Sequence, residues 1–118
     1  MALLSTILTA FVALEHAGFM VLEMFMWTKP MGLKTFGQTL EQARQSAPLA
    51  ANQGLYNGFL SAGLVWSLVA PAQIAVPVRV FFLACVVVAG VFGAATAKRS
   101  ILFVQALPAA IALVVTLI

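Results

Sequence analysis

The chain has 118 residues, of which 64% are apolar and only 8% are charged. So few charges cannot give a domain of this size a hydrated surface, since soluble chains are about a quarter charged. The composition therefore excludes a soluble globular domain. It also excludes disordered, disulfide-rich and nucleic-acid-binding proteins, which need polar sequence, several cysteines or a dense basic patch. A mean hydropathy of +1.11 indicates an integral membrane protein, with the lipid bilayer as its first partner.

Four apolar stretches are long enough to cross the hydrocarbon core of a bilayer, which takes about 20 residues of helix. They cover approximately 2–27, 49–70, 80–97 and 101–118. No stretch alternates apolar and polar residues as a barrel strand does, and a helix satisfies its own backbone hydrogen bonds in lipid. We therefore predict an all-α protein, with residues 1–118 forming a single four-helix membrane bundle.

Basic residues predict the orientation of this bundle, because they favour the cytoplasmic side of a membrane. Five of the six lie in the first and third connections, which are Lys29, Lys34, Arg44, Lys98 and Arg99. Arg79 alone borders the second connection. We predict a multi-pass protein of the bacterial inner membrane, with the first and third connections in the cytoplasm and both termini outside.

The connection between the first two spans is the longest, and part of it has helical periodicity. Four residues share one face of a helix over 34–47, namely Phe36, Leu40, Ala43 and Ala47. A short helix on the cytoplasmic interface and a solvated connector explain this pattern equally well. Pro48 suits the start of the second span.

Small residues recur at four-residue spacing in two of the spans. The positions are Gly54, Gly58 and Ala62 in the second span and Ala89, Gly93 and Ala97 in the third. Such stripes let helix backbones approach closely in lipid. They serve either packing within one bundle or association of two subunits.

Ionisable residues are concentrated in the first span, in the stretch LEHAGFMVLEMFMW. Glu15, His16 and Glu23 would each cost about 2.5–3.5 kcal/mol at the centre of a membrane helix, so each needs a partner or a purpose. His16, Glu23 and Trp27 fall on one stripe of this helix, and Glu15 lies beside it.

The second span begins with amides and a phenol at heights that match these acidic residues. Its polar positions are Asn52, Gln53, Tyr56 and Asn57, and Gln105 of the fourth span reaches the same layer. We predict one polar cluster in the cytoplasmic half of the bundle. In it, Glu15, His16 and Glu23 are candidates for proton exchange, because one histidine can neutralise at most one of the two carboxylates.

The remaining polar residues are then candidates for ligand binding: Asn52, Gln53, Tyr56, Asn57, Gln105 and Trp27. The alternative is that these groups only form hydrogen bonds that set the register of the helices. We expect no cofactor and no metal ion, since a metal site would need ligands from a second subunit. Catalytic triads and phosphate-binding glycine loops are absent from the sequence.

The pair of motifs LEHAGFMVLEMFMW and NQGLYNGFLSAGL, in a chain with four apolar stretches, resembles the domain of unknown function 1304 family of small, mostly bacterial membrane proteins. The resemblance covers essentially the whole chain. It implies a four-helix integral membrane protein and brings no established activity, substrate or cofactor. The signature positions are occupied here by Glu15, His16, Glu23, Asn52, Gln53, Tyr56 and Asn57.

The leading functional hypothesis is proton-coupled transport or binding of a small ligand, with a homodimer expected because a pathway in so small a bundle would lie between subunits. One alternative is an intramembrane enzyme that uses the same groups for acid–base chemistry on a lipophilic substrate, as an isomerase, cyclase or hydrolase would. Another is a structural or regulatory membrane subunit.

Overall fold

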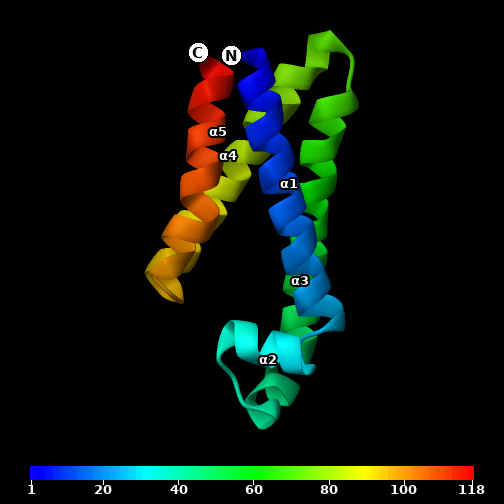
Figure 1. Ribbon diagram of the computed structural model, residues 1–118, viewed down its shortest axis with the longest axis vertical. Coiled ribbons are helices and arrows are strands. Elements are labelled where there is room, and N and C mark those ends of the chain that lie inside the picture. Colours follow the sequence, from blue (N-terminus) through cyan, green and yellow to red (C-terminus); the bar gives the residue numbers. More distant parts are fainter. The chain divides into compact units, whose positions relative to one another are not determined.

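A computed structural model describes all 118 residues, and every regular element in it is a helix. The chain forms two compact units, of which one is built from two segments that are distant in the sequence and the other from one continuous segment (Figure 1). Unit one comprises Met1–Leu14 and Leu60–Ile118, and unit two comprises Glu15–Phe59. The predicted all-α class is confirmed.

The first long helix, α1, spans Ala2–Phe25 and contributes to both units. It ends two residues before the predicted limit at Trp27, in a turn where the Lys29 N–H donates to the Met26 carbonyl (3.1 Å). The short helix α2 (Pro30–Phe36) follows, with proline in its first turn, where a missing N–H is tolerated.

The next helix, α3, spans Leu40–Val69 and begins much earlier than the predicted second span. Gly37, at φ 62°, ends α2 in the left-handed region. Thr39 and Gln42 then exchange side-chain and backbone hydrogen bonds, as a capping box does, and so start a new helix. The predicted helix over 34–47 is therefore interrupted at Gly37, and Pro48 lies inside α3 rather than at its start.

The helix α4 spans Ala72–Thr96 and also begins before its predicted limit at Val80. Pro71 precedes its first turn, and its carbonyl accepts from the N–H groups of Ile74 and Ala75 (3.0 Å each). Pro77 is accommodated near the start of the helix. Arg79 is consequently a buried helical residue and not part of the second connection.

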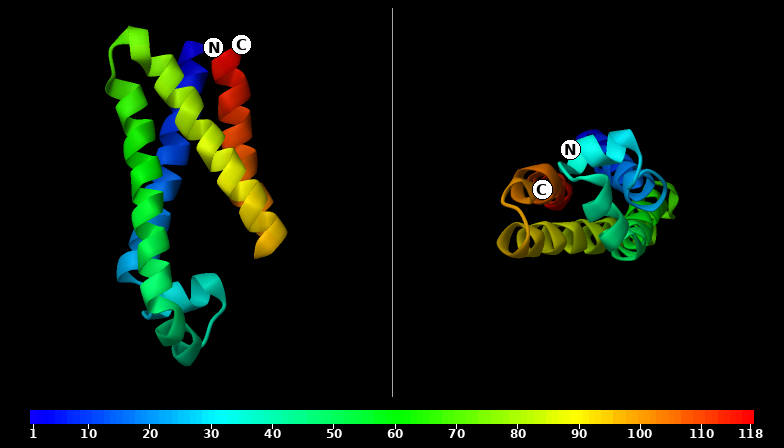
Figure 2. Two further views of the ribbon diagram at one scale, coloured as in Figure 1. Left: turned by 180° about the vertical axis from the view of Figure 1, so that it is seen from behind. Right: turned by 90° about the horizontal axis from the view of Figure 1, so that it is seen from below.

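The final helix begins with one π-helical turn, η1 (Leu102–Ala106), and continues as α5 (Leu107–Leu117). The Leu107 N–H donates to the Leu102 carbonyl, five residues earlier. Pro108 supplies the physical reason, because it has no N–H to continue the α-helical hydrogen bonds. This helix pairs with α4 in unit one (Figure 2).

Unit one has its own apolar core at the meeting of four helical segments. The buried core residues are Val12, Ala13, Leu64, Leu83, Val86, Ala109 and Ala112. The Ser61 hydroxyl joins α3 to α1 by donating to the Ala13 carbonyl (2.7 Å). The backbones of α4 and η1 approach so closely that a Cβ on Gly90 would lie 2.6 Å from the Ala106 nitrogen.

The small-residue stripes are used only in part. Gly54 and Gly58 face α1 within unit two, and Gly93 faces Ile101 within unit one. Ala62 and Ala89 are exposed, however, and the closest backbone contact of α4 is made by Gly90, outside the predicted stripe. Both stripes thus contribute glycines to packing within the chain.

Two helices are long and apolar enough to cross a bilayer, namely α1 and α4. Core helices of soluble proteins can meet the same criterion of length and composition. The amides of α3 lower its hydropathy, and the last helix has only the 16 residues from Leu102 to Leu117. Four membrane spans therefore stay a prediction.

Candidate functional site

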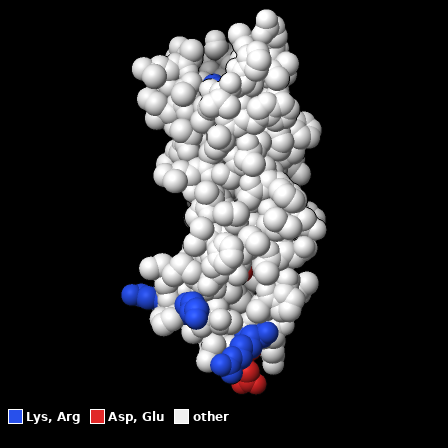
Figure 3. Space-filling view, turned by 90° about the vertical axis from the view of Figure 1, so that its right-hand side faces the viewer, with Lys and Arg blue, Asp and Glu red and all other residues white.

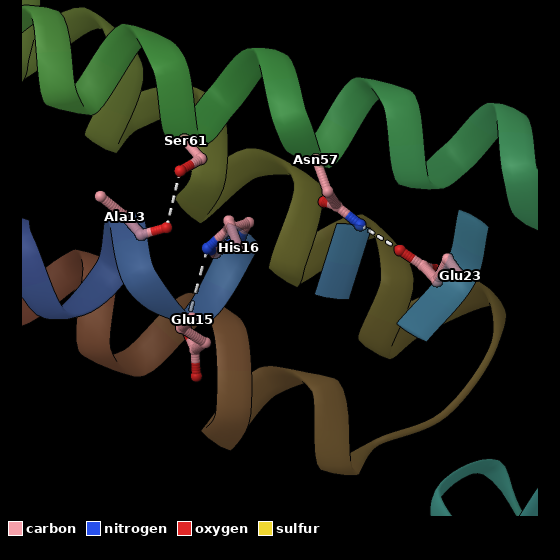
Figure 4. A network of polar contacts seen from close by, with 6 residues as sticks. All are labelled: Ala13, Glu15, His16, Glu23, Asn57 and Ser61. Carbon is pink, nitrogen blue, oxygen red and sulfur yellow. Dashed lines mark hydrogen bonds and ion pairs between the residues drawn. The ribbon is translucent and has the colours of Figure 1, made fainter. Parts of the chain in front are cut away.

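The carboxyl group of Glu23 is the centre of a buried polar site in unit two. Glu23 lies near the end of α1 and is only 5% exposed. Its Oε2 accepts from the Gln53 side-chain amide (2.9 Å), and its Oε1 accepts from the Asn57 amide (2.5 Å). Figure 4 shows the side chains of Glu23 and Asn57 pointing toward each other. Both carboxyl oxygens therefore have an amide donor from α3.

Helical geometry explains why, of the polar residues in this part of α3, Gln53 and Asn57 are the two that reach Glu23. Gln53 and Asn57 are four residues apart and so lie on one face, whereas Asn52 and Tyr56 lie about 100° around the helix. Asn52 and Tyr56 are exposed, and the Tyr56 ring packs at 6.2 Å on the neighbouring Phe59 ring. The structure thus brings two of the four predicted residues to Glu23.

A glycine allows α1 and α3 to come close enough for these hydrogen bonds. A Cβ on Gly54 would lie 2.7 Å from Met24 Cγ and 3.2 Å from the Met20 carbonyl oxygen. Because Gly54 lies directly after Gln53, its missing side chain sets the distance that the amides must cover. The predicted close-approach role of this glycine is confirmed within unit two.

Glu15 and His16 form a second, separate pair on α1 (Figure 4). His16 is fully buried, and its Nδ1 lies 3.9 Å from Glu15 Oε1. This carboxyl oxygen is itself buried and has no hydrogen-bond partner. Glu23 thus has its amide partners on α3, whereas Glu15 lies nearest to His16 on its own helix. A single cluster of all these residues stays a prediction.

The other predicted ligand contacts lie elsewhere in the chain. The Trp27 ring nitrogen donates to the Ser46 hydroxyl (3.1 Å), and its ring packs on Phe36 (4.8 Å between centroids). Trp27 therefore holds α2 and the start of α3 together within unit two. Gln105 lies in η1 and belongs to unit one. No group of three His, Cys, Asp or Glu side chains is arranged to hold a metal ion.

The structure also contains a polar cluster in unit one that sequence reasoning missed. Arg79 is 9% exposed, and its guanidinium donates to Ser5 Oγ (2.9 Å), Ser67 Oγ (3.4 Å) and the Ser67 carbonyl oxygen (3.3 Å). The feature of the sequence that could have indicated this cluster is the position of Arg79, directly before the apolar stretch that begins at Val80. Because Pro77 was read as the limit of the span, Arg79 was counted with the connection instead.

Comparison with known proteins identifies the family. Residues 10–117 match the family described as "Protein of unknown function (DUF1304)". The chain is 32% identical to "Uncharacterized protein YpaA" from Lactococcus lactis subsp. lactis (strain IL1403), over 117 residues that cover 97% of each chain. No solved structure matches. The chain therefore belongs to the DUF1304 family, as the two polar motifs predicted.

Proposed function

We propose that this protein is an integral membrane protein in which the Glu23 carboxyl group exchanges a proton during transport or binding of a small ligand. The observation that carries the proposal is a carboxyl group with 5% exposure, inside an apolar helix, whose two oxygens are each held by an amide. A group that is costly in a membrane helix and has dedicated partners is a candidate for function.

The surface of the chain supports the membrane assignment. Large apolar side chains are exposed along the helices, for example Leu3 (75%) in α1, Phe92 (68%) in α4 and Phe103 (61%) in η1. Much of the face drawn in Figure 3 carries neither acidic nor basic side chains. Residues 49–69 and 101–118 contain no charged residue, which supports two further spans beside α1 and α4.

The two amides suit a carboxyl group that changes its protonation state. An ionised carboxylate only accepts hydrogen bonds, and it is matched by the NH₂ groups of Gln53 and Asn57. A protonated carboxyl group also donates, and either amide can rotate to offer its carbonyl oxygen. The same residues can therefore satisfy both states, whereas fixed lysine or arginine partners would satisfy only the ionised one.

A ligand would have to enter this site by displacing an amide. The depression lined by Leu40, Glu41, Arg44 and Gln45 does not include Glu23. A protonated amine or an amide of a ligand could replace the NH₂ of Gln53, which is the more exposed of the two amide residues. Proton release from Glu23 would then be coupled to binding of a hydrogen-bond donor or cation.

Carbodiimide labelling tests whether Glu23 takes up a proton in an apolar setting. The purified protein in neutral detergent is treated with dicyclohexylcarbodiimide, which reacts with protonated carboxyl groups, and the labelled peptides are mapped by mass spectrometry. We expect label at Glu23 that decreases as the pH rises, and its loss in Glu23→Gln. The exposed residue Glu41 supplies the control, Glu41→Gln. An unlabelled Glu23 at acidic pH would contradict proton exchange.

Proteoliposomes test the coupled transport. Vesicles containing a pH-sensitive dye are given a membrane potential, and proton entry is measured for the wild type, Glu23→Gln and Glu41→Gln. We expect a proton leak through the wild type and Glu41→Gln that Glu23→Gln reduces to the rate of empty vesicles. Equal rates in all vesicles would count against a transport pathway through Glu23.

A second candidate function is favoured by the Glu15–His16 pair. An unpartnered buried carboxyl oxygen 3.9 Å from an imidazole is an arrangement that acid–base catalysis uses. An intramembrane enzyme would depend on Glu15 and His16. Glu15→Gln would then abolish turnover of a lipophilic substrate, whereas Glu23→Gln would lose the carbodiimide label at position 23 and keep turnover.

A further inference from the structure

Arg79 is a buried cation without an acidic partner. All three acidic residues of the chain, Glu15, Glu23 and Glu41, belong to unit two, whereas Arg79 belongs to unit one. Its hydrogen bonds go to neutral groups, the Ser5 hydroxyl and the hydroxyl and carbonyl of Ser67. Buried charges are ordinarily paired, because neutral oxygens solvate a cation without cancelling its charge.

The guanidinium also retains unused hydrogen-bonding capacity. It has five N–H groups, and its three hydrogen bonds occupy three of them. The Ser67 carbonyl lies in the last turn of α3, where the helix dipole supplies only about half of a negative charge. A net positive charge and two donors therefore remain at a site that is 9% exposed.

Three hydroxyl groups are linked to Arg79 directly or through Ser5, namely those of Ser5, Ser67 and Thr116. Ser67 Oγ donates to the Leu64 carbonyl (2.6 Å), and Thr116 Oγ1 donates to the Ala112 carbonyl (2.7 Å). Ser5 Oγ lies 2.6 Å from Thr116 Oγ1, which leaves the Ser5 proton for that contact. These three hydroxyl protons are all engaged within the protein.

Thr9 is the exception. It lies one turn after Ser5 on the same face of α1, is fully buried, and its hydroxyl has no hydrogen-bond partner. A buried hydroxyl without a partner is uncommon. The free hydroxyl of Thr9 and the two free N–H groups of Arg79 are donors without acceptors within one unit of the fold.

We propose that Arg79, together with Thr9 one helical turn from its partner Ser5, forms a binding site for an oxyanion, carried either by a free ion such as phosphate or by a lipid headgroup. A guanidinium presents parallel N–H groups that match carboxylate and phosphate oxygens. The anion would supply both the missing negative charge and the missing acceptors. This site lies in unit one and is independent of the function proposed for Glu23.

Thermal unfolding of the full chain tests this site. The protein is delipidated in neutral detergent, and Tm is measured against sodium phosphate at constant ionic strength set with sodium chloride. A parallel series adds phosphatidylglycerol to the micelles, with phosphatidylcholine as the control lipid. A ligand that binds the folded state raises Tm in a saturable manner. A response to phosphate identifies a free anion, and a response to phosphatidylglycerol alone identifies a headgroup.

Three variants locate the response. Arg79→Gln removes the charge and should abolish the rise in Tm, while Arg99→Gln, an exposed position in the same unit, should keep it. Thr9→Val removes a hydroxyl that makes no hydrogen bond in the protein, so it should fold normally and weaken binding about tenfold or more, as expected for a lost hydrogen bond to a charged group. Thr9→Val therefore carries the test if Arg79→Gln fails to fold.

The proposal is overturned by any of three results. The first is a wild type whose Tm shows no saturable rise with phosphate or phosphatidylglycerol. The second is a Thr9→Val variant that binds both ligands with unchanged affinity. The third is an equal loss of the response in Arg99→Gln, which would assign the effect to general surface charge.

Discussion

The Asn57 side-chain amide donates to the Glu23 carboxyl group across 34 positions of sequence, with 2.5 Å between Nδ2 and Oε1. This contact links α1 to α3 inside unit two. It gives the acidic side chain of Glu23, in an otherwise apolar helix, a hydrogen-bond partner. Polar recognition between helices, and not apolar packing alone, therefore specifies how these two segments meet.

The Glu23–Asn57 contact should be measurable as a coupling energy. We expect Asn57→Ala to lower the free energy of unfolding by about 1–3 kcal/mol, because it removes a donor from a buried carboxyl group. In Glu23→Gln the same substitution should cost less, giving a coupling of about 0.5–3 kcal/mol. Unfolding by sodium dodecyl sulfate in neutral micelles measures the four free energies. Strict additivity would show that the contact contributes nothing to stability.

Gly90 and Gly18 form a matched pair for testing backbone packing. A Cβ at Gly90 would meet the Ala106 backbone, so Gly90→Ala should separate α4 from η1 and lower the free energy of unfolding by about 1–3 kcal/mol. Gly18 has nothing within 4 Å of such a Cβ. Gly18→Ala should therefore stabilise the protein by about 0.5–1 kcal/mol through helix propensity. Equal effects of the two variants, by the same unfolding assay, would argue against the close approach.

Gly37 should resist substitution for a conformational reason. Its φ of 62° ends α2 in a region that costs an L-residue about 1–2 kcal/mol. We expect Gly37→Ala to destabilise the connection by approximately that amount and to make it more sensitive to limited proteolysis, whereas Gly37→Asn should be milder. Identical cleavage rates for the wild type and both variants would contradict the left-handed turn.

Cysteine accessibility tests the predicted orientation. In a Cys85→Ser background, Lys34→Cys in α2 and Gln73→Cys at the start of α4 are labelled in intact cells with a membrane-impermeant maleimide. The basic first connection predicts that position 34 is protected until the membrane is opened and that position 73 reacts directly. Direct labelling at both positions would exclude the four-span topology, in which they lie on opposite sides.

The amino-acid sequence by itself indicated the all-α class of this protein and the residues worth examining. Composition predicted a membrane protein, and the two polar motifs indicated the family to which the chain belongs. These conclusions depend on properties that each short segment carries alone, such as hydropathy, charge and periodicity.

Helix limits and partners were decided by interactions that a local pattern does not contain. Pro48 and Pro77 were read as boundaries, yet both lie inside helices, because a helix can accommodate a missing N–H near an end or on an exposed face. Gly37 and the Thr39–Gln42 cap set the break instead.

Only the tertiary structure decided which polar residues meet. Heights along two helices can be matched from the sequence, but the rotation of one helix against the other cannot. That rotation brings Gln53 and Asn57 to Glu23 and leaves Asn52 and Tyr56 exposed. Packing within unit one likewise brings Ser5 and Ser67 to Arg79 from separate helices, and Thr116 to Ser5. A side chain's partners are fixed by packing across the fold and not by its neighbours in the chain.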